Sequence, residues 1–159
     1  MKQIAFRYGL WLFFGLTGFF LLMHIFNLSG NAYLRAFNGV IHIGVLWMAL
    51  REWTRTHHDG TSDITSSVIL GMFTSVVGVI PFSIFMSIFL AFNPEFLASI
   101  RSQTSIGEYF TPLTSSLFVV VEAIVFSLIV SYIMARIQAP IRPSEKTLNI
   151  KERTGDATE

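Results

Sequence analysis

Residues 64–92 read ITSSVILGMFTSVVGVIPFSIFMSIFLAF, a run of about 29 residues without a charged side chain. Roughly 20 mostly apolar helical residues cross the hydrocarbon core of a bilayer, so this run is long enough to span a membrane. The segment must be an α-helix, because an exposed strand in lipid would leave its backbone N–H and C=O groups unpaired. This stretch therefore predicts an all-α membrane protein.

Three more apolar runs lie on either side of it, and they cover about 8–28, 34–50 and 112–137. Hydrophobic residues make up 52% of the chain and charged residues 13%, against about 25% charged residues in an ordinary soluble domain. We therefore expect a bundle of four transmembrane helices over 1–138, followed by a polar cytoplasmic tail over 139–159 that is too rich in charge and proline to pack a core.

The positions of lysine and arginine predict the orientation of the four spans. Nine of these residues precede the first span or follow the second and fourth, whereas two lie on the other side. The nine are Lys2, Arg7, Arg51, Arg55, Arg136, Arg142, Lys146, Lys151 and Arg153; the two are Arg35 and Arg101. Because cytoplasmic loops carry the excess of positive charge, both termini should be cytoplasmic, and for a bacterial source the protein should lie in the inner membrane.

An alternative for the first span is a cleaved signal peptide. Met1–Arg7 resembles the charged start of such a peptide, and Gly30-Asn31-Ala32 supplies small residues for cleavage. The apolar run is longer than the 7–15 residues or so of a signal sequence and carries Trp11, which favours a retained span.

Proline marks the start of two further helices. Thr111-Pro112 predicts a capping residue followed by proline at the first helical position of the fourth span. Asn93-Pro94-Glu95 predicts a short helix in the outer interface, with Phe96, Leu97 and Ile100 on one face.

Glu122 is the most informative polar residue, because a lone carboxylate within a span is costly and usually faces the bundle or a wet cavity. It lies roughly 15 Å from the outer end of its span and His42 roughly 12 Å from the outer end of a parallel span. We expect Glu122 and His42 to meet in the bundle, with Asn38 one turn above His42. Three roles stay open: a structural pair, two unrelated residues, or a proton or ion relay.

Two other patterns concern helix packing. Small residues recur at spacings of four in the fourth span and predict a face for close helix contact, within the chain or with another protein: Ser115, Ala123, Ser127, Ser131 and Ala135. Thr74 and Gly78, with Gly15 and Gly18, are weaker versions of this pattern. Pro81, one turn after Gly78, predicts a kink in the third span.

The remaining histidines give weak signals. His24 and His42 could hold a haem between two helices, but their depths match poorly. His57-His58-Asp59 is more typical of a solvated turn than of a metal site. The chain has no cysteine, no nucleophile with a base, no phosphate loop and no basic stripe for nucleic acid, so we expect no enzyme, no metal and no cofactor.

The chain resembles the domain-of-unknown-function family 4199, a family of small bacterial four-span membrane proteins. The resemblance rests on Arg7-Tyr8-Gly9-Leu10, Asp59-Gly60, Phe92-Asn93-Pro94-Glu95-Phe96, and Glu122 followed by Ser127-Leu128-Ile129-Val130-Ser131. It implies the four-helix architecture and places Glu122 on a family position, and it implies no activity.

These observations predict a non-catalytic accessory or scaffold protein that packs against other membrane proteins, or itself, through the small face of the fourth span. The alternative is a small transporter or channel-like homo-oligomer with Glu122 and His42 in a polar path. The direction of Glu122 distinguishes the two, because a wet cavity favours transport and a partner within the bundle favours a structural role.

Overall fold

A computed structural model describes residues 1–26, 32–56, 64–103 and 105–138, with the backbone alone for 32–36. Over these ranges the protein is all-helical, as the sequence predicts. The elements are α1 (Lys2–Ile25), α2 (Ala32–Thr56), α3 (Ile64–Phe92), α4 (Pro94–Ser102), the 3₁₀ helix η1 (Gly107–Tyr109) and α5 (Pro112–Gln138). The expected tail over 139–159 and the turn at His57-His58-Asp59 lie outside the described residues, as do Gly30 and Asn31 of the cleavage site.

Three of these helices, α1, α3 and α5, are long and apolar enough to cross a membrane. The predicted third span coincides with α3, and the predicted fourth span ends one residue before α5 does. The helices α1 and α2 extend beyond the predicted spans, α1 at its start and α2 at both ends, because apolarity marks only the lipid-facing length of a helix. In α2, the extension includes the charged residues Arg51, Glu52 and Arg55.

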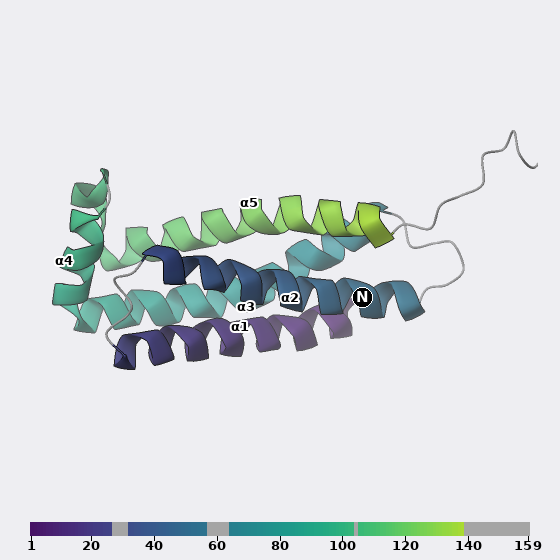
Figure 1. The fold of residues 1–159 in the computed structure, drawn as a ribbon, viewed down its shortest axis with the longest axis horizontal. Helices are drawn as coiled ribbons and strands as arrows, with labels where there is room; N and C mark the ends of the chain where they lie inside the picture. Colours follow the sequence, from purple (N-terminus) through teal and green to yellow (C-terminus); the bar gives the residue numbers. More distant parts are fainter. Residues whose placement is uncertain (27–31, 57–63, 104, 139–159) are drawn as a thin grey trace, which may run out of the picture.

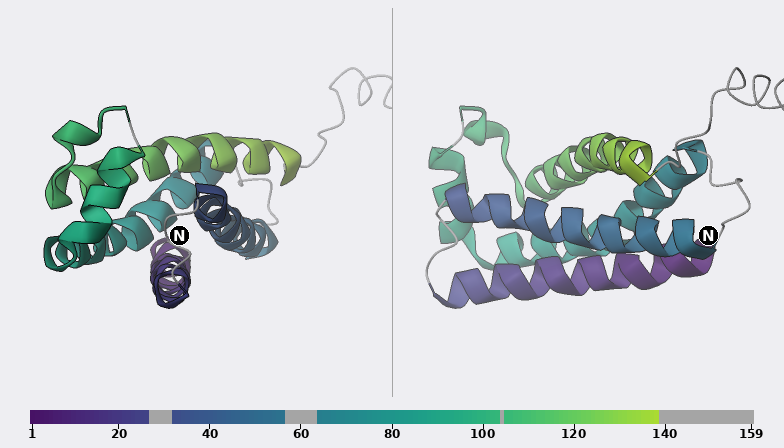
Figure 2. Two further views of the ribbon diagram at one scale, coloured as in Figure 1. Left: turned by 60° about the vertical axis from the view of Figure 1, so that its left-hand side comes forward. Right: turned by 45° about the vertical axis from the view of Figure 1, so that its right-hand side comes forward.

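The four long helices run side by side, and the short α4 lies across one end of them (Figure 1). The start of α1 and the end of α5 lie together at the opposite end, which we call the terminal end; the other is the α4 end. Helix α3 packs extensively against both α1 and α5, and α2 contacts α1, α3 and α5. Figure 2 shows from two further sides how α4 turns across the bundle.

Both proline-marked helix starts are present, and they are built differently. The backbone N–H of Thr114 donates to the hydroxyl of Thr111 (3.1 Å), and the N–H of Thr111 donates to the hydroxyl of Thr114 (2.7 Å), so the two residues cap α5 reciprocally. At α4, the side chain of Asn93 instead donates to the carbonyl of Phe89 (2.8 Å) in α3. Asn93 therefore satisfies the end of α3 and leaves the start of α4 without a side-chain cap.

The short α4 buries the face that the sequence predicts. Leu97 is buried, and Phe96 and Ile100 pack against the same core cluster as Leu97, which contains residues of α1, α2 and α3. A second cluster fills the terminal end of the bundle: Ala5, Leu46, Leu50, Trp53, Leu70 and Met134. The bundle therefore has one apolar core towards α4 and another, tightly packed, towards the chain ends.

Two close helix crossings set the position of α3. A Cβ atom added at Gly78 would lie 2.8 Å from the carbonyl oxygen of Gly9 and 2.9 Å from Cβ of Leu12, so α1 passes directly over this glycine. A Cβ atom at Gly71 would lie 2.7 Å from Cβ of Ser131 in α5. Small residues at these points let the helix backbones approach closely, which is how helices associate in lipid.

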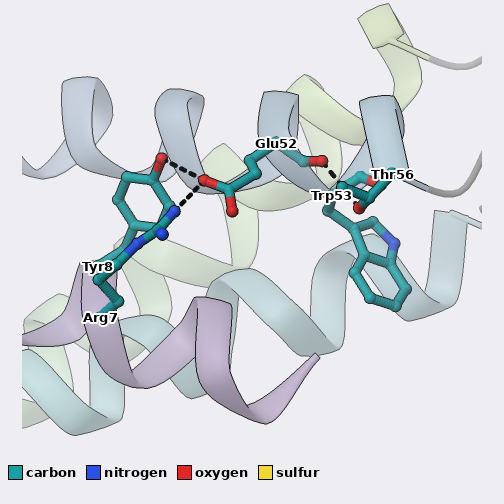
Figure 3. A network of polar contacts seen from close by, with 5 residues as sticks. All are labelled: Arg7, Tyr8, Glu52, Trp53 and Thr56. Carbon is teal, nitrogen blue, oxygen red and sulfur yellow. Dashed lines mark hydrogen bonds and ion pairs between the residues drawn. The ribbon is translucent and has the colours of Figure 1, made fainter.

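A polar network joins α1 to α2 at the terminal end (Figure 3). Arg7 forms an ion pair with Glu52, and the hydroxyl of Tyr8 donates to the same carboxylate oxygen (2.7 Å). Because Arg7 and Glu52 are partly exposed, the ion pair itself contributes little to stability.

Candidate functional site: a cavity at the α4 end

A cavity of about 430 Å³ lies between the long helices at the α4 end. Its volume is within the range of small-molecule sites, about 300–1,000 Å³. All four long helices and α4 contribute to its lining. The lining residues are Leu16, Phe20, Met23, Asn38, Gly39, His42, Val79, Phe82, Met86, Phe96, Ser99, Ile100, Gln103, Val119, Glu122, Ala123 and Phe126.

Glu122 faces this cavity because of its register on α5. Val119 and Phe126 lie three residues before and four residues after it, on the same helix face, and both also line the cavity. Glu122 is exposed, and among the described residues it has no hydrogen bond or ion pair. Its carboxyl group is therefore free to meet water or a ligand.

His42 lines the same cavity but is bonded elsewhere. It is buried, and its Nε2 atom lies 2.7 Å from the hydroxyl of Ser75 in α3. The Ser75 hydroxyl lies 2.6 Å from that of Ser127 in α5, which donates to the carbonyl of Gly71 (3.3 Å). This chain of hydrogen bonds joins three helices and leads from the cavity towards the terminal end.

Asn38 supplies the third polar residue that the sequence singles out. It lines the cavity, and its Oδ1 atom is buried without a hydrogen-bond partner among the described residues. A buried acceptor without a partner is costly, and a turn of the side-chain amide would bring this atom to the cavity surface, where water or a ligand can bond it. Glu122, His42 and Asn38 thus line one cavity, although the bond of His42 goes to Ser75 and not to Glu122.

Sequence reasoning missed the contribution of α4 and the roles of two serines. Ser99 of α4 and Gln103, directly after that helix, add polar groups to the cavity wall. Ser75 stands unmarked in a long apolar run, and Ser127 is one of the small residues assigned to packing. No sequence signal separates a serine that bonds across the bundle from one that only leaves space for a neighbouring helix.

The small face of α5 packs within the chain. Ser115, Ser127, Ser131 and Ala135 are buried and Ala123 is partly buried. The hydrogen bond of Ser127 to Gly71 and the close approach of Ser131 to the same glycine place the middle of this face against α3. It is therefore occupied by the protein's own third long helix.

The other packing residues are placed as follows. Gly15 faces Ile41 in α2, with 3.1 Å between the Ile41 methyl group and an added Cβ, whereas Gly18 has no neighbour within 4 Å. Gly78 forms the crossing with α1, and α3 continues as one helix through Pro81, so the kink at Gly78 and Pro81 stays a prediction.

His24 and His42 lie in different surroundings. It packs among the rings of Phe20, Phe89 and Phe96, with 4.9 Å between the centroids of His24 and Phe89, and it does not line the cavity. Across the described part of the chain, no three histidine, aspartate or glutamate side chains gather as a metal site would require.

Removing the hydroxyl of Ser75 should destabilise the bundle. Ser75→Ala leaves both His42 and Ser127 with one partner fewer in a buried site, which costs about 1–3 kcal/mol. The neighbouring Thr74→Val is the control, because the Thr74 hydroxyl donates to the Leu70 carbonyl of its own helix and, within the described part of the chain, to no other helix. We expect thermal unfolding in detergent to show a clear loss for Ser75→Ala and a small one for Thr74→Val; equal losses would contradict the bonding role.

Comparisons of the chain with models of protein families, with curated proteins and with solved structures found no match.

Proposed function

We propose that the protein is a four-span membrane protein that admits a small molecule to the cavity at the α4 end and acts as a small transporter. The observation that carries this proposal is the free carboxyl group of Glu122 in a cavity built by all four long helices. An ionisable group within a span is expensive, and where it faces a cavity it typically marks a substrate or ion path.

We count α2, the second span that the sequence predicts, as a transmembrane helix alongside α1, α3 and α5. Residues 37–50 of α2 carry no Asp, Glu, Lys or Arg, and α2 packs along α1, α3 and α5. Arg51 and Arg55 of α2 lie at the terminal end together with Lys2 and Arg136. This clustering supports cytoplasmic termini by the positive-inside rule, and for a bacterial source the inner membrane; the α4 end then faces outwards.

The packing on either side of His42 supports one-sided access. Towards the α4 end lies the cavity, whose lining includes the exposed residues Gln103 and Glu122. Towards the terminal end lies the second apolar cluster, in which Leu46, Leu50 and Leu70 are at most 1% exposed. We infer an outward-facing, inward-closed state, which is one of the two states that transport by alternating access needs.

An accessory role is the alternative, and its support is weaker. It relied on the small face of α5 as a docking surface, and α3 already occupies that face. Recovery of a stoichiometric membrane partner from mild detergent would restore this alternative and contradict a self-sufficient transporter.

Thiol labelling tests the transporter directly, because the native chain has no cysteine. We expect Glu122→Cys to react with a membrane-impermeant maleimide in right-side-out vesicles and, more slowly, in inside-out vesicles. Leu128→Cys on the exposed surface of α5 is the unreactive control, and Ile106→Cys, in the exposed segment after α4, should react from the outside alone.

Each other result has a definite meaning. Labelling of Glu122→Cys from the outer side alone would support a binding protein and contradict transport. Failure to label from either side, with Ile106→Cys reactive, would show that water does not reach Glu122 and would overturn both the transporter and the cavity on which it rests.

A further inference from the structure

The chemistry of the cavity wall indicates what kind of molecule it takes, and this inference rests on the proposed function. Among the described lining residues, Glu122 is the one charged side chain. Arg101 of α4, the nearest arginine in sequence to the lining residues Ile100 and Gln103, donates from Nε to the carbonyl of Phe110 (2.6 Å) and is not part of the lining. Glu122 is therefore the one group of the described lining that can carry a negative charge, and a monocation would balance it.

The rest of the wall disfavours a strongly hydrated cation. Four phenylalanine rings, Phe20, Phe82, Phe96 and Phe126, line the cavity together with aliphatic side chains. A divalent metal ion prefers several oxygen ligands, and the wall offers a single carboxyl group. Aromatic faces attract organic cations whose charge is spread over alkyl groups, and they also bury an apolar body.

Asn38 adds a requirement for a hydrogen-bond donor. Asn38 lines the cavity, and its Oδ1 atom lies beneath the wall surface without a partner among the described residues, so a turn of the side-chain amide would present it to a ligand. A protonated amine donates an N–H to such an acceptor, whereas a quaternary ammonium has no N–H to give. The two acceptors, Asn38 and Glu122, lie on different helices and would hold the polar head of the ligand between them.

We propose that the cavity binds a lipophilic organic monocation, specifically a protonated amine with an apolar body. Glu122 balances the charge, Asn38 accepts the N–H, and the phenylalanine rings contact the apolar body.

A competition experiment with compounds of similar shape tests each part of this assignment. The probe is tritiated N,N-dimethylbenzylamine, protonated at pH 7, bound to purified protein in lipid nanodiscs. The competitors are benzyltrimethylammonium, which keeps the charge and lacks the N–H; neopentylbenzene, its neutral isostere; and 3-phenylpropionate, an anion. We expect the amine to bind several-fold more tightly than the quaternary ion, and the neutral and anionic compounds to bind at least about tenfold more weakly than the amine.

Two variants assign the contributions to residues. Glu122→Gln should weaken the binding of the amine and of the quaternary ion alike, by roughly ten- to a hundredfold, and should leave the affinity for the neutral isostere unchanged. Asn38→Leu should abolish the difference in affinity between the amine and the quaternary ion. Ser102→Ala, whose hydroxyl bonds within α4, is the control and should behave as the native protein does.

Equal binding of the neutral isostere or of the anion would overturn the assigned ligand class and leave the cavity as a binding site. No binding of any of the four compounds, to a protein whose Glu122→Cys variant labels with maleimide, would overturn the inference alone. No binding together with no labelling would overturn the proposed function as well.

Discussion

Gly71→Ala is expected to destabilise the protein by about 2–3 kcal/mol, because the new methyl group has no room between α3 and α5. Its Cβ would lie 2.7 Å from Cβ of Ser131 and would overlap the Ser131 hydroxyl. Both atoms belong to α5 at its contact with α3, so relief requires the two helices to separate. A loss of this size should lower the melting temperature in detergent by several degrees.

Ser131→Gly supplies the matched compensation, because it removes both atoms that the new methyl group meets. We expect Ser131→Gly alone to cost little more than its helix propensity, about 0.5–1 kcal/mol, and to restore most of the loss in the double variant. Gly18→Ala is the neutral control, since no atom of the described residues lies within 4 Å of an added Cβ there. Additive losses for Gly71→Ala and Ser131→Gly would contradict the close crossing of α3 and α5.

Gly78→Ala is expected to cost a similar amount, whereas Pro81→Ala should be tolerated. An added Cβ at Gly78 would lie 2.8 Å from the carbonyl oxygen of Gly9 and 2.9 Å from Cβ of Leu12, and neither atom can turn away as a flexible side chain would. The loss should appear as a lower melting temperature and as aggregation in size-exclusion chromatography.

This pair separates two roles for the middle of α3. If Gly78 serves mainly as a hinge beside Pro81, alanine at either position should reduce the proposed transport more than it lowers the melting temperature. If Gly78 serves the crossing with α1, as its contacts indicate, only Gly78→Ala should affect folding. A stable Gly78→Ala protein would contradict the crossing.

Much of the fold was predictable from the sequence, for physical reasons. The limits of α3 and α5 follow from long apolar runs, which Glu122 alone interrupts with a charge before Arg136 near the end of α5, and the start of α5 follows from the pairing of Thr111 with Pro112. The short α4 follows from Asn93-Pro94-Glu95 and the apolar residues after it. Counting residues along two parallel spans predicted similar depths for Glu122 and His42, with Asn38 one turn above His42, and all three residues line one cavity.

The neighbours of each helix face were not predictable in the same way. Depth along a helix comes from counting residues, whereas the partner of a face depends on how all the helices pack. The small residues of α5 predicted a close contact without identifying α3, and Gly9 gave no signal of its crossing with Gly78. The hydrogen bond of His42 to Ser75 was likewise hidden, because Ser75 resembles the other serines of α3.

The most direct test of the account is whether water reaches Glu122 in the resting protein. Nitroxide labels on single-cysteine variants, Glu122→Cys and Leu128→Cys, would be compared by electron paramagnetic resonance with a water-soluble nickel chelate and with oxygen, which concentrates in lipid. We predict that the label at 122 relaxes faster with the nickel chelate and the label at 128 faster with oxygen. A label at 122 that behaves like the one at 128 would contradict the cavity and, with it, the proposed transporter.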